Sequence, residues 1–428
     1  GTAVVFESAT TANMSLSFDS TNNKVVITYT DAGNSNYGTA IVGTVSGTDI
    51  SFGSATTFTS SAVANYMVNA YDPDQQKTIV AYANSGSSNV GEARVGTVSG
   101  TSISFGSAIN FDTPASGNAA SYVGIAYDTS NDKIVIVNSN GGFSVVAGTV
   151  SGNTITFGAD FVIDTDTSGA YSTVVFDSSN NKLVVAYYDG NNGGKGTAHV
   201  FTLGSGINLT SENFIGFAQD TVADGQPVTI NTKGAIADNI PQIPSASSSL
   251  GTAVSFESAT TSRIASCFDS TNNRIVVSYV DSGSDDDGTV AVGTVSASDN
   301  SISWGIPVHF NSNVKITDSQ IIHDSNSNKI VVAYTDEDNS FYGTGIVGTI
   351  DTSDNSISFG SPTVYESGNT NTSSRNGITF DSNSNKVVIC YVDQGNSNYG
   401  TAVVGTVSGT SISFGTPVVF ESAFSIHM

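Results

Sequence analysis

The sequence predicts an all-β protein, a seven-bladed β-propeller made of four-stranded antiparallel blades. Three observations lead to this fold class. A unit of about 55 residues recurs seven times along the 428 residues of the chain. Each unit contains four short runs of β-branched and aromatic residues, separated by clusters of Asn, Gly, Ser and Asp. Apolar residues nowhere show the spacing that marks an amphipathic helix.

The repeat is anchored by a short apolar run that ends in an aromatic residue followed by Asp, with His replacing the aromatic residue in the sixth unit. The seven anchors end at Asp19, Asp72, Asp128, Asp177, Asp269, Asp324 and Asp381. Their spacing is regular except between the fourth and the fifth, where the excess length marks an insertion. Self-similarity at a period of this size predicts a repeat architecture.

The first unit shows the expected elements in order. Its second strand is apolar on both faces, because Val25 and Ile27 point to one side and Val26 to the other. Such a strand needs cover on both sides. Similar sheets stacked face to face around an axis supply that cover, and seven of them close a ring. The four strands of the unit are predicted at 14–19, 24–31, 39–45 and 50–58.

Two other arrangements of the repeat are less favoured. A β-solenoid usually has a shorter coil, and separate small sandwiches of this size bury too little surface to be stable alone. The two ends of the chain bear on closure of the ring, because segment 2–6 recurs at 416–420. Either one copy completes a blade that begins at the other terminus, or the chain boundary overlaps a repeat by a few residues.

The chain, 1–428, is predicted to form one propeller that carries an insertion at 206–250. Within the insertion, 214–218 and 227–232 flank an Asp-Gly turn signal and predict a β-hairpin. The Pro- and Ser-rich stretch 241–249 predicts a flexible linker that leads back to the fifth unit.

The charge balance excludes several classes of partner. The chain has 13 basic and 37 acidic residues, a net charge of -24, spread along its length. Such a field repels phosphates and anionic membranes, so we expect no nucleic acid partner. No apolar run approaches the length of a membrane span, so no membrane insertion is expected. The low charged fraction with abundant Ser, Thr, Asn and Gly is typical of extracellular proteins.

Catalytic motifs are not evident, and we predict that the chain is not an enzyme. It contains no nucleophile motif, phosphate-binding loop or His/Cys metal spacing. The alternative is a propeller glycosidase, which would need paired carboxylates near the axis. Only Arg263 and Arg375 lie where two arginines could reach one shared face. Cys267 and Cys390 belong to different units and are expected to be buried free thiols.

Acidic loops supply candidate metal ligands. The loop after the second strand is richest in carboxylates in the fifth unit, where Asp281, Asp285 and Asp287 are the candidate Ca²⁺ ligands. The alternative is a structural turn, in which Asp accepts hydrogen bonds from its own backbone. The same alternative applies to the turn that follows each first strand.

The loops after the second strands also carry the candidate ligand-binding residues. In a propeller these loops open on the same face as the links between blades, so they form one surface. An exposed aromatic ring beside amides and hydroxyls suits stacking on a sugar, although each ring can instead pack on the next blade. The candidates are Tyr37 beside Asn36, Tyr342 beside Ser340, and Tyr399 beside Asn398.

The repeat resembles segments of tail-fibre and other virion structural proteins of marine bacteriophages. The matching text is FDSTNNKVVITYTDAGNSNYGTAIVGTVSGTDISFG, residues 18–53. Residues 208–239 of the insertion resemble a short module of such proteins, which lacks its usual continuation here. The resemblance implies a virion or cell-surface role in attachment, and similar repeats are equally compatible with bacterial surface proteins.

The sequence thus predicts a non-enzymatic, extracellular recognition or adhesion protein that binds a cell-surface glycan, with a phage tail fibre or a surface adhesin as its setting. The second hypothesis is a structural spacer that contacts other virion or surface subunits. A propeller glycosidase is the third.

Overall fold

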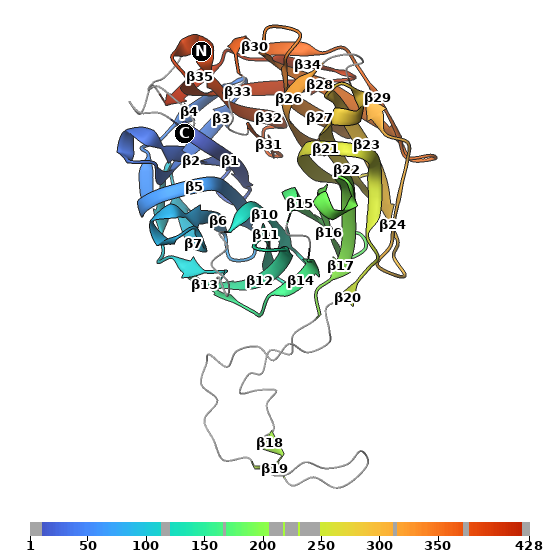
Figure 1. Ribbon diagram of the computed structural model, residues 1–428. Helices are drawn as coiled ribbons and strands as arrows, with labels where there is room; N and C mark the ends of the chain where they lie inside the picture. Colours follow the sequence, from blue (N-terminus) through green and yellow to red (C-terminus); the bar gives the residue numbers. More distant parts are fainter. Residues whose placement is uncertain are drawn as a thin grey trace.

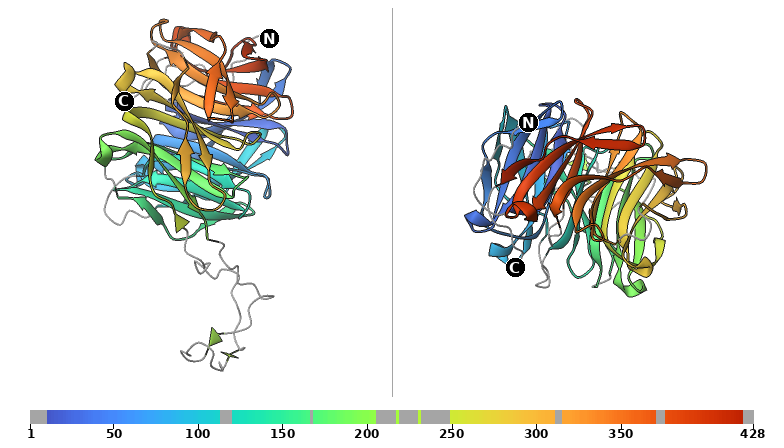
Figure 2. Two further views of the ribbon diagram at one scale, coloured as in Figure 1. Left: turned by 90° about the vertical axis from the view of Figure 1, so that its right-hand side faces the viewer. Right: turned by 90° about the horizontal axis from the view of Figure 1, so that it is seen from above.

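The computed structural model describes residues 11–112, 120–165, 168–204, 217–218, 230–231, 249–310, 315–370 and 376–421. Within these ranges the regular elements are β-strands and one-turn 3-10 helices. The strands surround a central axis, and the first and last units of the sequence lie side by side in the ring (Figure 1). Figure 2 shows the ring from two sides, with the strands running between its two ends.

Each unit contributes three consecutive antiparallel strands, counted outward from the axis. The inner strands are β1 (Thr11–Asp19), β5 (Thr56–Asp72), β10 (Ser121–Asp128), β15 (Ala170–Asp177), β21 (Val254–Asp269), β26 (Ile316–Asp324) and β31 (Gly377–Asp381). The second strands are β2 (Lys24–Asp31), β6 (Lys77–Asn84), β11 (Lys133–Ser139), β16 (Lys182–Asp189), β22 (Arg274–Asp281), β27 (Lys329–Asp336) and β32 (Lys386–Asp393). The third strands are β3 (Tyr37–Ser46), β7 (Val90–Ser99), β12 (Phe143–Ser151), β17 (Lys195–Thr202), β23 (Asp287–Val295), β28 (Tyr342–Asp351) and β33 (Tyr399–Ser408).

The outer edge differs from the single fourth strand predicted at 50–58. Two separate pieces pair with different halves of each third strand, as β4 (Asp49–Phe52) and the start of β5 do on β3. The first pieces of the other units are β8 (Ser102–Phe105), β13 (Thr154–Phe157), β20 (Ser249–Leu250), β24 (Ile302–Trp304), β29 (Ser356–Phe359) and β34 (Ser411–Phe414). The second pieces are β9 (Ile109–Asn110), β14 (Phe161–Asp164), the start of β21, β25 (Val308–His309), β30 (Thr363–Asn369) and β35 (Val418–Glu421).

A glycine separates the two outer pieces and lies against the next unit. A Cβ atom built on Gly106 would come within 1.9 Å of the carbonyl oxygen of Asn153, in the outer turn of the following unit. The absence of a side chain at this glycine leaves space for the outer turn of the neighbouring unit. Five other glycines make the same approach to the next unit: Gly53, Gly251, Gly305, Gly360 and Gly415.

The hydrogen-bonded sheets are five in number, besides a two-stranded ribbon, rather than seven separate sheets. Because β5 and β21 each run from the outer edge of one unit to the axis of the next, they join two units into one sheet of nine strands. This continuity is a difference from the predicted four-stranded blades.

The core lies between neighbouring sheets. Consecutive inner strands contact one another around the axis, and β31 also contacts β1. One buried cluster contains Val25 and Ile27 of the first unit together with Val388 of the last. The first and last sheets therefore meet by side-chain packing. On the last unit, β35 occupies the outer position, whereas segment 2–6 lies outside the described residues.

The turn after each inner strand is stabilised by its own Asp side chain. Of the two alternatives, a metal-binding loop and a structural turn, the structure supports the structural turn. In the first unit the carboxylate of Asp19, 1 % exposed, accepts hydrogen bonds from the backbone N–H groups of Thr21 and Asn22. The same two bonds recur at the other six anchors. The Asp caps its own turn.

The two cysteines and the insertion were also the subject of predictions. Cys267 and Cys390 are buried free thiols, as predicted. In the insertion, β18 (Phe217–Ala218) pairs with β19 (Ile230–Asn231), while the stretch 241–248 lies outside the described residues. No helix in the described ranges has the length and apolar character needed to cross a lipid bilayer.

Candidate functional site

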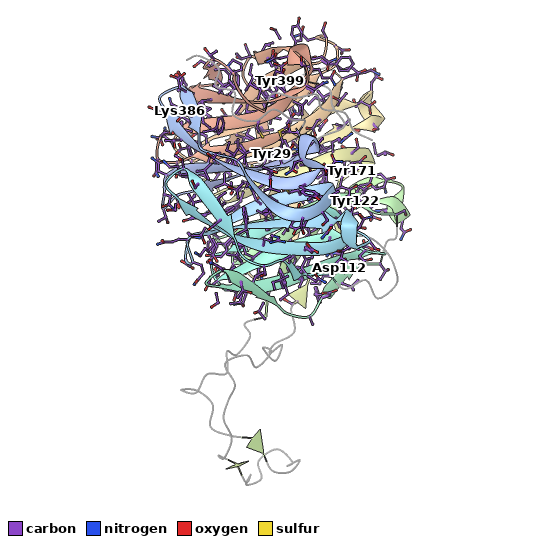
Figure 3. The ribbon with its side chains drawn as sticks, turned by 90° about the vertical axis from the view of Figure 1, so that its left-hand side faces the viewer. Tyr29, Asp112, Tyr122, Tyr171, Lys386 and Tyr399 are labelled. Atoms are coloured by element: carbon purple, nitrogen blue, oxygen red, sulfur yellow. The ribbon has the colours of Figure 1, made fainter. Side chains whose placement is uncertain are left out.

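The ring has a turn end and a loop end, which are formed by different connections between the strands. At the turn end each inner strand meets its second strand, as Asp19 meets Lys24. At the loop end the inner strands begin and the second strands pass into the third, as Asp31 pairs with Tyr37. Figure 3 places Lys386 at the turn end and Tyr122 and Tyr171 at the loop end.

Bulges interrupt the inner strands near the loop end. In β1 the register shifts between Ala12 and Ser15, and equivalent shifts occur in β5, β10, β15, β21 and β26. A bulge leaves a residue unpaired and redirects its side chain. Four bulge residues adopt a left-handed backbone, with φ between 48° and 54°: Asn13, Tyr122, Tyr171 and Arg263.

These conformations are unusual for large side chains. Asn is tolerated in the left-handed region, whereas Tyr and Arg are disfavoured there. Each such residue costs on the order of 1–3 kcal/mol, and such strain often marks a functional site. The strain therefore directs attention to the cavity that these residues line.

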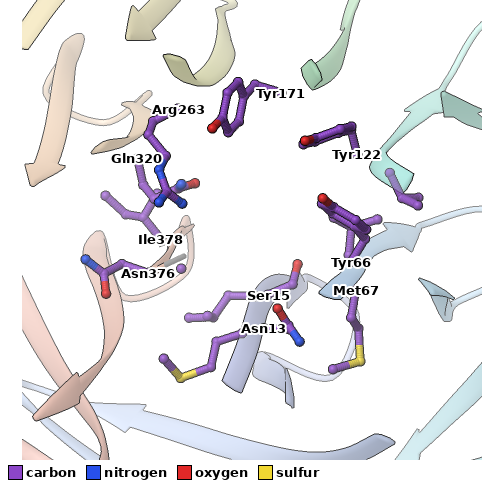
Figure 4. Close-up of a pocket in the computed structure, with 15 residues that line it drawn as sticks. Asn13, Ser15, Tyr66, Met67, Tyr122, Tyr171, Arg263, Gln320, Asn376 and Ile378 are labelled. Carbon is purple, nitrogen blue, oxygen red and sulfur yellow. The ribbon is translucent and has the colours of Figure 1, made fainter. Parts of the chain in front are cut away.

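An axial cavity of about 310 Å³ opens among the bulges at the loop end. Tyr66, Tyr122 and Tyr171 come from three consecutive units and form one wall, with ring centroids 4.9 Å and 5.4 Å apart in succession. Arg263 lies 5.9 Å from the Tyr171 ring, a cation–π distance. Figure 4 shows the tyrosine hydroxyls and the guanidinium group directed into the cavity.

The remainder of the cavity combines amides with apolar side chains. Asn13, Gln320 and Asn376 contribute the amides, and Met14 and Leu16 belong to the apolar part. A second cavity of about 660 Å³ shares several of these lining residues and extends to serines at the turn end. The two cavities therefore follow the axis from its aromatic loop end toward the turn end.

The loop residues predicted as a binding surface lie elsewhere. Tyr37, Tyr342 and Tyr399 are half-buried, and each begins the third strand of its own unit. Their neighbours Asn36, Ser340 and Asn398 have left-handed backbones at the loop turns. None of these six residues is among those lining the axial cavity. Ligand binding by the loop residues therefore remains a prediction, and it concerns a surface separate from the axial cavity.

The proposed calcium ligands are occupied by other contacts. The carboxylate of Asp281 accepts a hydrogen bond from the Gly283 N–H, and Asp285 lies 2.7 Å from the Lys315 ammonium group. Asp287 lies 3.8 Å from His309. In the part of the chain that the structure describes, no three His, Cys, Asp or Glu side chains form a metal-ligand group.

A pair of carboxylates underlies the Tyr399 loop. Burial, followed by the charge of Glu366, raises the pKa of Asp393 to about 6. Glu366 in turn accepts a hydrogen bond from the Tyr391 hydroxyl at 2.8 Å, and Asp393 accepts one from the Asn396 N–H at 3.0 Å. Ionising both carboxylates at neutral pH therefore costs free energy.

Replacing Asp393 with Asn is expected to stabilise the protein above pH 7, by on the order of 1–3 kcal/mol. The folded state holds this proton up to about pH 6, whereas an unfolded Asp releases it near pH 4. The Asp393 carboxyl group therefore lowers the free energy of unfolding as the pH rises from about 4 to above 6. The amide of the Asp393→Asn variant does not titrate, so it has no such effect. Urea unfolding of both proteins from pH 4 to 8 measures the difference.

A matched control is the exposed Asp351, whose pKa is lowered by hydrogen bonds from Ser353. Asp351→Asn should give no gain at neutral pH. Parallel pH profiles for the wild type and Asp393→Asn would contradict the assignment.

The tyrosine wall was missed by the sequence predictions, although a signal was present. Tyr66, Tyr122 and Tyr171 precede the anchors Asp72, Asp128 and Asp177 by the same spacing as Asn13 precedes Asp19. This position varies from unit to unit while the surrounding text repeats. Arg263 and Arg375 share that position, and both were singled out. Arg263 lines the cavity, whereas Arg375 lies outside the described residues.

Comparisons with known proteins show the fold. No family model and no curated protein matches the chain. A protein from Lactobacillus plantarum aligns with a TM-score of 0.50 and 10 % identity, over 82 % of this chain and 84 % of its own. A candidate 6-phosphogluconolactonase from Bacteroides fragilis aligns with a TM-score of 0.50 and 8 % identity, over 98 % and 97 %. A lectin from Aleuria aurantia, solved with Fucα1-6GlcNAc, aligns with a TM-score of 0.43 and 12 % identity, over 80 % and 92 %.

The chain is a β-propeller protein, an all-β ring of antiparallel sheets. Likeness at these identities concerns the fold and not the function. The prediction that the chain is not an enzyme is corrected here. A candidate 6-phosphogluconolactonase is among the proteins of similar fold, so the lack of a catalytic motif does not exclude catalysis.

Proposed function

We propose that this propeller is a recognition protein that binds a glycan in the axial cavity at the loop end. The observation that carries the proposal is the wall formed by Tyr66, Tyr122 and Tyr171. Aromatic faces stack on the C–H groups of sugar rings, while phenolic hydroxyls exchange hydrogen bonds with sugar hydroxyls. The strained backbone of two of these tyrosines supports a role in binding, because packing alone does not require a bulky residue there.

The setting that we propose is a virion or a cell surface, with a tail fibre or an adhesin as the whole assembly. The resemblance of the repeat to virion structural proteins supports this setting. We also propose that the seven units count as seven blades, each with three full strands and a divided fourth.

Tyr122→Asn tests the site, because it installs the residue that the first unit carries as Asn13. We expect affinity for the bound glycan to fall about 10- to 100-fold through loss of stacking and of a hydroxyl. Stability should rise by about 1 kcal/mol, because Asn tolerates the left-handed backbone better than Tyr. The measurements are glycan-array binding, calorimetric titration of the best ligand and thermal unfolding.

The matched control replaces Tyr37, Tyr342 and Tyr399 together with Ser, which removes the loop aromatics and leaves the cavity intact. Binding lost in this variant but retained in Tyr122→Asn would move the site to the loops. Absence of binding across the array, with and without Ca²⁺, would overturn the proposal in favour of a structural spacer. Monitoring of released sugars during the titrations would reveal catalysis.

A further inference from the structure

The cationic side chains are unevenly distributed over the ring. Seven of the 13 basic residues begin the second strands at the turn end, away from the axial cavity: Lys24, Lys77, Lys133, Lys182, Arg274, Lys329 and Lys386. At the loop end Lys315 is paired with Asp285. Arg94 donates hydrogen bonds to the Tyr82 hydroxyl and to the Gly106 carbonyl. These cations are thus either remote from the cavity or already bound.

Arg263 is different. It lines the axial cavity, and in the described part of the chain it makes no hydrogen bond or ion pair. Its guanidinium group offers five N–H donors in a planar fork that matches a carboxylate. No Asp or Glu is among the described residues that line the cavity, although the chain carries 37 acidic residues. Behind this lining, the buried carboxylate of Asp318 accepts a hydrogen bond from the Asn376 backbone N–H. Among the described residues that line the cavity Arg263 is the one charged side chain, and its guanidinium group suits an anionic ligand group.

Further unused polar groups lie on the same side as Arg263. The Gln320 amide is beside Arg263, across the cavity from Tyr66 and Tyr122 (Figure 4). The side chain of Asn376 is 3 % exposed, and within the described residues neither its oxygen nor its nitrogen has a hydrogen-bond partner. Buried amides are nearly always paired, so a partner from a ligand or water is expected here. The cavity thus has an aromatic wall and a donor-rich wall that face each other.

We infer that the ligand of this cavity is an acidic sugar, whose ring lies on the tyrosine wall and whose carboxylate is bound by Arg263. The inference rests on the proposed glycan recognition and specifies its substrate class. A neutral sugar would leave the guanidinium group without an anionic partner. A small carboxylate without a ring would leave the tyrosine wall uncovered.

The test compares uronic-acid oligosaccharides with the same oligosaccharides after conversion of their carboxylates to methyl esters. Wild-type protein is expected to bind the acid form about 10- to 100-fold more tightly than the ester, the range of a charge-assisted hydrogen bond. Arg263→Gln should remove that preference, so that acid and ester bind this variant equally. Arg263→Lys should restore part of it, because it returns the charge without the planar fork.

Lys315→Gln is the matched control, since it makes the same change in net charge at the loop end but outside the cavity. It should keep the preference for the acid. Equal binding of acid and ester by the wild type, or an unchanged preference in Arg263→Gln, would overturn the acidic-sugar inference while glycan recognition stands. Failure of acid, ester and neutral glycans alike to bind the folded wild type would overturn the proposed function itself. Thermal unfolding of each variant separates loss of binding from loss of structure.

Discussion

Replacing Gly106 with Ala is expected to lower the free energy of unfolding by about 3 kcal/mol, the upper range for an overpacked site. The new Cβ would lie 1.9 Å from the Asn153 carbonyl oxygen, a backbone atom of the next unit. A flexible side chain could move aside at little cost, but this oxygen belongs to the outer turn between β12 and β13. Relief therefore requires two neighbouring sheets to separate. Urea unfolding of the purified protein measures the loss.

Gly158 provides an internal control, because it occupies the same repeat position one unit later and makes the same type of backbone bond, to Ala147. The insertion replaces the outer turn that would face it in the fourth unit. Among the described residues, a Cβ on Gly158 would meet the Ala147 oxygen alone, at 3.7 Å. Gly158→Ala should leave the free energy of unfolding unchanged or raise it by about 0.4–1 kcal/mol, because Ala lowers the conformational entropy of the unfolded chain. Equal destabilisation by both substitutions would show that the contact between units is not responsible.

Replacing Asp177 with Ala should lower the free energy of unfolding by about 3 kcal/mol, because it removes a buried charged acceptor that holds three hydrogen bonds of the turn. The Asp177 carboxylate accepts hydrogen bonds from the Ser179 and Asn180 N–H groups and from the Asn180 side-chain amide, at 2.9, 3.2 and 2.8 Å. The residue is 1 % exposed. Water therefore cannot readily replace it. Chemical unfolding, followed by far-ultraviolet circular dichroism, measures the change.

The Asn substitutions at two anchors distinguish the bonds within this turn. In Asp177→Asn an NH2 group replaces the oxygen that accepts from the Asn180 side-chain amide, so two donors face each other. We expect the free energy of unfolding to fall by about 1–2 kcal/mol. Asp72 accepts the two backbone bonds, but Gln75 replaces the amide donor in its turn, and burial raises the pKa of Asp72. Asp72→Asn should therefore cost less than Asp177→Asn. The reverse order would contradict this assignment of the turn hydrogen bonds.

The all-β class, the seven units and the order of their strands were predictable because they depend on contacts within a unit. Alternating β-branched residues such as Val25 and Ile27 specify a strand covered on both faces, and the Asp19 turn closes the first hairpin by local hydrogen bonds. The divided outer strand was not predicted. Its break at Gly53 lies against the turn at Thr101 in the next unit, a contact that nothing in the first unit reveals.

The candidate site was predicted only in part, for the same reason. Arg263 was recognised as a residue able to reach a shared face, but its neighbours Tyr66, Tyr122 and Tyr171 were not. Each tyrosine belongs to a different unit, and each looks like one more aromatic residue at the start of a strand. The packing of consecutive sheets around the axis and the bulges of their inner strands bring the Tyr122 ring within 4.9 Å of Tyr66 and 5.4 Å of Tyr171.

The repeat, the strand pattern, the turn chemistry and the buried free cysteines could be predicted from the amino-acid sequence, because short-range hydrogen bonds and side-chain alternation carry that information. The aromatic end of the axis, the division of the outer strand and the lack of a hydrogen bond or ion pair at Arg263 among the described residues became apparent from the tertiary structure. These features arise where residues from different units meet, and their geometry depends on the packing of one sheet against the next.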